Sequence, residues 1–162
     1  MNIENTCFFS GHRYIPRSQI DIITESLKNS IIYLVRNGVT NFIAGGALGF
    51  DTLCADTIIN MQSNSIEFAQ KVRLSLYLPC YDQTKNWSWA DKYHFNMIKF
   101  HASDYRYITE SPYTKDCMKL RNFAMVDNAK WGIVYCTKIR SGTHQTISYA
   151  NRVGRSIINI AP

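Results

Sequence analysis

Short apolar segments alternate with segments of helical periodicity along almost the whole sequence. Between residues 17 and 36 the apolar side chains recur three or four positions apart and would share one helix face: Ile20, Ile23, Leu27, Ile31 and Leu34. The same criteria predict helices at 17–36, 50–61, 87–101, 115–127 and 143–152. Strands are expected between them, at 6–9, 39–44, 72–78, 104–109, 131–136 and 156–160.

This alternation predicts the fold class. Strands separated by helices pair in parallel through right-handed crossovers, which place helices on both faces of one sheet. We therefore expect an α/β fold with three layers, Rossmann-like, with a mainly parallel central sheet. The 162 residues suit one domain with its own core, and no linker or internal repeat divides them.

Composition narrows the functional classes. No apolar run is long enough to span a membrane, and the first residues lack the features of a signal peptide, so we expect a cytoplasmic protein. The five cysteines are widely spaced without a metal-binding pattern, so we expect reduced thiols and no metal site. A net charge of +6 favours anionic partners, but the basic residues are scattered, and nucleic acid is not an expected partner.

The segment 42–51 contains a glycine turn between an apolar strand and a helix. Gly45, Gly46 and Gly49 allow positive φ and leave no Cβ over the turn. The helix that follows offers unpaired N–H groups and a positive dipole end, which together favour a phosphate. Asp51 would cap this helix or accept a hydrogen bond from a sugar hydroxyl. A tight strand–helix turn without a ligand is the alternative.

Distinctive residues follow four of the expected strands, at the edge where an open parallel sheet binds ligands. They are Ser10, Gly11, His12 and Arg13; Gly45, Gly46, Gly49 and Asp51; Pro79, Tyr81 and Gln83; and Ser141, Gly142 and Thr143. Residues needed only for structure would not have to gather at one edge, so this edge is the expected site. The turn 141–143 is either a second phosphate cradle or a helix N-cap.

The helix at 115–127 carries a further candidate. Met118, Arg121, Asn122 and Met125 are spaced to share a face. Arg121 would bind phosphate bidentately, and Asn122 would contact a base or ribose. The alternative is a solvated arginine beside core methionines.

Histidines and aromatic residues leave similar alternatives open. His12 and His144 fall in the expected ligand-side loops, where each is either a proton donor, an anion contact or a hydrogen-bonded structural residue. Trp87, Trp89 and Tyr93 would stack on a base, or belong to the core or to a dimer contact.

Five segments in order resemble the YpsA-like branch of the SLOG superfamily. They are SGHR at 10–13, GGALGFD at 45–51, LP at 78–79 with Gln83 and Trp87, MKLRNFAMVD at 118–127, and SGT at 141–143. The resemblance covers nearly the whole chain. It implies a Rossmann-like fold with a pocket for nucleotides or nucleotide-derived ligands, including ADP-ribose-like signals made from NAD, which many members bind without converting.

Two related groups supply the alternative functions. The LOG-type phosphoribohydrolases hydrolyse nucleoside monophosphates and carry a GGxGTxxE motif together with an arginine that Arg121 matches. Their glutamate is replaced here by Thr146, which neither stabilises an oxocarbenium-like centre nor activates water well. Asp51 or Asp127 is the alternative for that role, but nothing in the sequence shows it. We therefore assign no catalytic residue. DprA-type domains bind single-stranded DNA, which requires a basic groove with stacking aromatic residues.

From these observations we expect a non-catalytic protein that senses or sequesters a nucleotide or NAD-derived signal such as an ADP-ribose species. A phage or host sponge for immune signals is one form of such sequestration. We expect a homo-oligomer, no membrane partner and no required cofactor. The expected ligand-binding residues are Ser10, Gly11, His12, Arg13, Gly45, Gly46, Ala47, Gly49, Asp51, Pro79, Gln83, Met118, Arg121, Asn122, Asp127, Ser141, Gly142 and Thr143.

Overall fold

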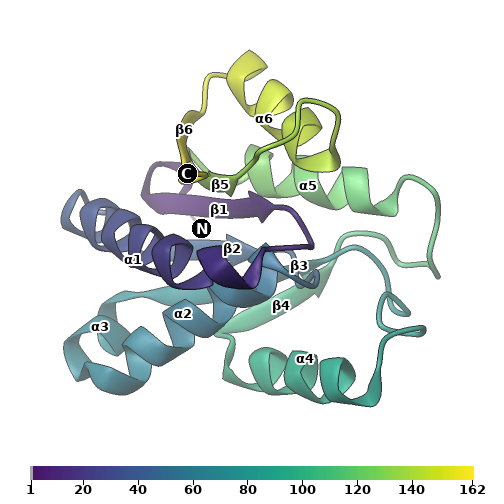
Figure 1. The fold of residues 1–162 in the computed structure, drawn as a ribbon, viewed down its shortest axis with the longest axis horizontal. Helices are drawn as coiled ribbons and strands as arrows, with labels where there is room; N and C mark the ends of the chain where they lie inside the picture. The colour runs from purple at the N-terminus through teal and green to yellow at the C-terminus, as the bar shows by residue number, and fades with distance from the viewer. Residues whose placement is uncertain (1) are drawn as a thin grey trace.

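The computed structural model describes residues 2–162, which form a six-stranded sheet with helices on both faces (Figure 1). The strands are β1 Thr6–Gly11, β2 Asn41–Ala44, β3 Arg73–Leu78, β4 Asp104–Tyr107, β5 Trp131–Tyr135 and β6 Ser156–Asn159. The helices are α1 Ile20–Arg36, α2 Phe50–Asn64, α3 Ile66–Lys71, α4 Trp89–His101, α5 Cys117–Asp127 and α6 Gly142–Arg152. Short 3₁₀ turns occupy Ile3–Asn5 and Arg17–Gln19.

All neighbouring strands pair in parallel, in the order β4-β3-β2-β1-β5-β6. The chain steps from β1 outward to β4 and then returns to place β5 on the other side of β1. The strand order therefore reverses between β1 and β5. In open α/β sheets the crevice at this reversal, beyond the carboxyl ends of the strands, is where ligands bind.

The two faces of the sheet have separate cores, because successive side chains of a strand point to opposite faces. Cys7 and Phe9 of β1 pack with α1, α2 and α4, whereas Phe8 packs with α5 and α6. Figure 1 shows α5 and α6 on the opposite side of the sheet from α1, α2 and α4. Both sides of β1 are thus buried, which fixes the strand end that carries Ser10 and Gly11.

The Rossmann-like fold class, the six expected strands and the five expected helices are confirmed, with shifts of a few residues at their ends. The helix expected from residue 87 begins at Trp89, because Ser88 caps it by accepting a hydrogen bond from the Asp91 N–H. The helix α3, which follows α2 after a single break at Ser65, is not among the helices that the sequence predicts. Within residues 2–162, no helix combines the length and apolar character needed to cross a membrane.

Candidate anion-binding site at the carboxyl edge of the sheet

A cleft of about 230 Å³ opens where the strand order reverses. Its walls come from the end of β1, the turn before α2, the first turns of α5 and the start of α6. The lining residues all belong to the expected ligand-binding set: Ser10, Gly11, His12, Arg13, Ala47, Asp51, Met118, Arg121, Asn122, Ser141, Gly142 and Thr143. We call this space the anion cleft.

Arg121 and Asp51 form a buried ion pair at the base of the anion cleft. Arg121 Nη1 lies 3.4 Å from Asp51 Oδ2, and both side chains are 6% exposed. Nη1 also donates to the carbonyl of Gly45, and the Ala47 N–H donates to Asp51 Oδ2 at 3.3 Å. The glycine turn after β2 is therefore held by Arg121 of α5, and Asp51 ties it to the first turn of α2.

The remaining donors of Arg121 are poorly satisfied by the protein. Among the described residues, Nε has no hydrogen-bond partner, and Nη2 lies 3.8 Å from Met118 Sδ, a weak acceptor. Buried polar groups normally have partners, so the unpaired Nε calls for an explanation, of which a ligand or a water molecule is one. The guanidinium can therefore donate to an anion while Nη1 holds Gly45 and Asp51.

Burial shifts the pKa of both members of this pair. It raises the pKa of Asp51 above its ordinary value, against the opposing effects of Arg121 and the Ala47 N–H. It lowers the pKa of Arg121 from its ordinary value, against the opposing effect of Asp51. Arginine nevertheless stays protonated in proteins, so its charge is available to a ligand. Arg13, which is exposed, adds a second cation to the cleft.

The start of α6 supplies backbone donors. Ser141 caps the helix, and its Oγ accepts from the His144 N–H at 3.1 Å. The N–H groups of Gly142 and Thr143 fall in the first turn, where no intrahelical acceptor exists. An added Cβ on Gly142 would meet nothing within 4 Å, so this end of the helix is open. The hydroxyl of buried Thr146 donates to the Gly142 carbonyl at 2.9 Å.

His12 has a structural partner in the anion cleft. The Thr137 N–H donates to His12 Nε2 at 2.9 Å, which links the end of β1 to the loop after β5. A ring nitrogen that accepts this bond carries no proton. Burial and the neighbouring charge of Lys138 lower the pKa of His12, which keeps the ring neutral.

The other expected site residues lie around the cleft or away from it. Gly45 packs behind Arg121, and the Gly46 carbonyl accepts from Gln83 Nε2 at 3.4 Å. The carbonyl of Pro79 accepts from the Thr109 N–H at 3.2 Å. Asp127 is not part of the cleft. It ends α5, about 14 Å along the axis from Met118 at 1.5 Å per residue, and accepts from the Tyr149 hydroxyl.

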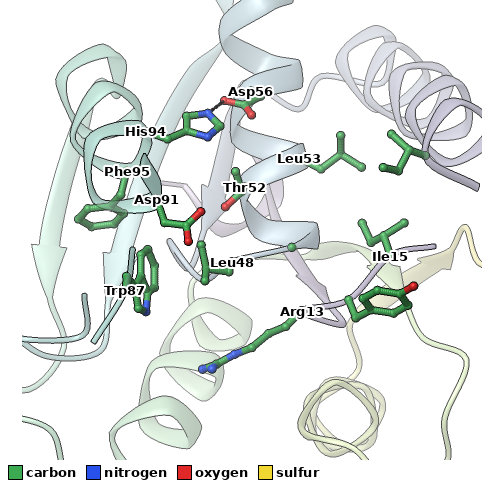
Figure 2. Close-up of a pocket in the computed structure, with 13 residues that line it drawn as sticks. Arg13, Ile15, Leu48, Thr52, Leu53, Asp56, Trp87, Asp91, His94 and Phe95 are labelled. Atoms are coloured by element: carbon green, nitrogen blue, oxygen red, sulfur yellow. Dashed lines mark hydrogen bonds and ion pairs between the residues drawn. The ribbon is translucent and has the colours of Figure 1, made fainter. Parts of the chain in front are cut away.

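A second cleft, of about 390 Å³, lies on the α2 and α4 side of the turn (Figure 2). Trp87 and Phe95 form one wall, with ring centroids 5.7 Å apart at an angle of 82°. We call it the aromatic cleft; its lining residues are Arg13, Tyr14, Ile15, Ile20, Leu48, Gly49, Thr52, Leu53, Asp56, Trp87, Asp91, His94 and Phe95. The sequence indicates only Arg13, Gly49 and Trp87 as candidates. The others come from the loop after β1, the turn before α2 and the faces of α1, α2 and α4, where they resemble ordinary core or surface residues.

A third feature is a basic flank beside the anion cleft. Arg13, Lys138 and Arg140 line one surface hollow together with Tyr14, which is 77% exposed. The cations are scattered along the sequence, but the fold brings these three together from two loops. His144 lies in the first turn of α6, where its N–H meets Ser141.

Comparison with known families identifies one match. The model of the YpsA family, described as the YspA SLOG family, matches residues 13–152. No curated protein sequence matches the chain.

Several solved structures share the fold, among them the following three. DNA processing protein A (DprA) from Streptococcus pneumoniae has a TM-score of 0.67 at 17% identity, over 95% of this chain and 49% of that one. DprA from Helicobacter pylori, described for its single-stranded DNA binding mode, has a TM-score of 0.64 at 14% identity, over 96% and 64%. The structural-genomics target TM1055 has a TM-score of 0.58 at 16% identity, over 94% and 72%. The chain therefore spans about half to two-thirds of the two DprA chains, and these likenesses establish the fold alone.

Proposed function

Because the chain belongs to the YpsA SLOG family, we propose that it binds a small phosphorylated, nucleotide-derived ligand in the anion cleft without converting it. An ADP-ribose species made from NAD is the ligand class that we favour. One observation carries the proposal, namely the buried guanidinium of Arg121, whose Nε has no acceptor among residues 2–162 and which lines the same cleft as the open start of α6.

The charges support a phosphate as the group held there. Arg121 and Arg13 contribute two positive charges, and Asp51 offsets one of them. The positive end of the α6 dipole and the N–H groups of Gly142 and Thr143 add fixed donors. Guanidinium groups and helix N-termini both suit phosphate oxygens. The cleft thus favours an anion over a neutral ligand.

The absence of turnover is also part of the proposal. The position that matches the LOG-type glutamate holds Thr146, whose hydroxyl is buried and donates to the Gly142 carbonyl. Asp51 is the carboxylate that lines the cleft, and it is engaged with Arg121 and the Ala47 N–H. Neither arrangement provides an evident general acid or base for cleavage of an N-glycosidic bond.

Thermal shift with a ligand series tests the proposal. AMP, ADP-ribose, cyclic ADP-ribose and ribose 5-phosphate are added, and the melting temperature is measured. A ligand at about 100 times its Kd stabilises by about 2.7 kcal/mol. For a chain of this size that is a rise of roughly 5–11 °C. Chromatography of the incubated ligands should return them unchanged, and release of free base would instead show an N-glycosidase.

Matched arginine variants locate the site. Arg13→Ala removes an exposed cation of the cleft and should lower the affinity without unfolding the protein. Arg36→Ala removes an exposed cation at the end of α1, at the opposite edge of the sheet, and should leave the affinity unchanged. Equal effects of the two variants, or no stabilisation by any phosphorylated ligand, would contradict the proposal.

Single-stranded DNA binding is a second candidate, favoured by the basic flank of Arg13, Lys138 and Arg140 beside Tyr14. Basic grooves with exposed aromatic side chains bind single strands through phosphates and stacking. The DprA from H. pylori, which shares the fold, is described for its single-stranded DNA binding mode, and this is why we consider the candidate. A mobility shift with an oligonucleotide at two salt concentrations tests it. A complex that weakens steeply with salt and depends on Lys138 would support DNA binding.

A further inference from the structure

We infer that the aromatic cleft is a second subsite, which binds the amino-substituted purine ring of the ligand whose phosphate lies in the anion cleft. This inference rests on the proposed function only for the position of the ligand's phosphate. The ring half depends on a different space, whose lining shares only Arg13 with that of the anion cleft, and it makes a separate prediction about which base is selected.

The two clefts adjoin through shared and neighbouring residues. Arg13 lines both of them. Ala47 lines the anion cleft, and the next two residues of the same turn, Leu48 and Gly49, line the aromatic cleft. Figure 2 shows the Arg13 side chain extending along the edge of the aromatic cleft toward Trp87. The two spaces therefore meet at Arg13 and the turn before α2, and the inference is that one ligand extends over both.

The walls of the aromatic cleft fit a flat ring. Trp87 and Phe95 form an edge-to-face pair on one side, Leu48 of the turn lies beside Trp87, and Leu53 lies across α2 from them, near Ile15 (Figure 2). Trp87 is half-buried, so part of its indole remains available to a ligand. A volume of about 390 Å³ falls within the range of small-molecule sites. Base stacking on aromatic side chains is a common mode of nucleotide binding.

The polar groups of the cleft select the kind of ring. Asp91 and Asp56 are its two carboxylates, and an ionised carboxylate can only accept hydrogen bonds. His94 Nε2 lies 2.8 Å from Asp56 Oδ1, which occupies one acceptor of that carboxylate. Ser88 Oγ donates to Asp91 Oδ2, and Figure 2 shows the Asp91 carboxylate directed toward Thr52. A ring with N–H donors, such as the amino group of adenine, satisfies Asp91, whereas a carbonyl at the same position is repelled.

Isothermal titration with AMP, IMP, adenosine and ribose 5-phosphate tests the inference. AMP should bind at least about tenfold more tightly than ribose 5-phosphate, which corresponds to about 1.4 kcal/mol. AMP should also bind more tightly than IMP, which carries a carbonyl in place of the amino group. Asp91→Asn adds an N–H donor beside the ring and should reduce or reverse the preference of AMP over IMP.

Two tryptophans provide a matched pair of variants. Trp87→Ala should remove most of the advantage of AMP over ribose 5-phosphate, and Trp87→Phe should keep part of it. Trp89→Ala is the control, because Trp89 is 78% exposed and stacks on Tyr93 outside the aromatic cleft. A melting curve of each variant confirms that it is folded.

The outcomes separate the two proposals. Equal affinity for AMP and ribose 5-phosphate, unchanged in Trp87→Ala, would overturn the ring subsite and leave the phosphate site standing. Binding of adenosine that depends on Trp87, without any effect of phosphate, would support the ring subsite and overturn the proposed function. Failure of all four compounds to bind would overturn both.

Discussion

The buried contact between Gly45 and Arg121 allows a sharp test of how the anion cleft is held together. Gly45 does not have a positive φ, so the backbone there accepts any residue. An alanine Cβ would instead overlap the Arg121 guanidinium and lie 2.5 Å from Asp51 Oδ2. Gly45→Ala must therefore displace the guanidinium from the Gly45 carbonyl and from Asp51.

The expected loss follows from burial. Both charged side chains are 6% exposed, so little of either is accessible to water. Breaking a buried pair while its charges stay buried costs about 3–5 kcal/mol. For a protein of this size that corresponds to a fall in melting temperature of roughly 6–20 °C. Affinity for phosphorylated ligands should fall as well, because Arg121 no longer holds its place in the cleft.

Gly142→Ala is the matched control for Gly45→Ala. Gly142 lies in the other glycine turn of the same cleft, and a Cβ there meets nothing within 4 Å. Its free energy of unfolding should change by no more than about 1 kcal/mol. Urea unfolding followed by circular dichroism measures both variants. If the free energies of unfolding of Gly45→Ala and Gly142→Ala lie within about 1 kcal/mol of each other, the idea that the Arg121–Asp51 pair depends on the space above Gly45 is refuted.

Two further predictions concern titratable groups. The pKa of His12 is lower in the folded protein than in the unfolded chain, so on acidification the unfolded chain is protonated first. Neutral His12 therefore contributes to stability above about pH 6.5, the ordinary pKa of histidine, and this contribution is lost as the pH falls through the folded pKa. Urea unfolding between pH 7.5 and 5 should show a steeper loss for the wild type than for His12→Asn, and parallel curves would contradict this. Burial raises the pKa of the Cys7 and Cys54 thiols, and Cys80 and Cys117 are also buried, whereas Cys136 is partly exposed. A thiol reagent at pH 8 should therefore modify Cys136 rapidly and the others only after unfolding, as mass spectrometry of the labelled peptides would show; rapid labelling of Cys7 in the native protein would contradict it.

The sheet and most helices could be predicted because their sequence patterns report burial directly. The buried side chains of α1, Ile23, Leu27, Ile31 and Leu34, are those that the helical spacing places on one face. The short helix α3 left no such pattern, since it has six residues, none of them buried, and Ile66 is 79% exposed. Its start is set by a local hydrogen bond from the Phe68 N–H to Ser65 Oγ.

The position of the anion cleft could also be predicted, because parallel strands bring their carboxyl ends to one edge whatever their order. Its internal pairing could not. Asp51 and Arg121 lie 70 positions apart, and nothing in the sequence indicates that they form a buried ion pair. Asp127, one of the expected site residues, lies outside the lining of the anion cleft for a geometric reason. Six positions beyond Arg121, an α-helix has turned by about 600°, so the two side chains leave α5 in different directions.

The distribution of charge between the two clefts has a consequence for selectivity. Asp51 already offsets Arg121 within the protein, so the donors left to a phosphate are fixed backbone N–H groups, the free edge of Arg121 and the exposed Arg13. Such donors recognise a phosphate whatever is attached to it. Discrimination among phosphorylated compounds must then come from the part of the ligand beyond the phosphate. Changes at Arg13 should therefore weaken all ligands by a similar factor, whereas changes at Trp87 and Asp91 should alter their order, which a panel of Kd values would separate.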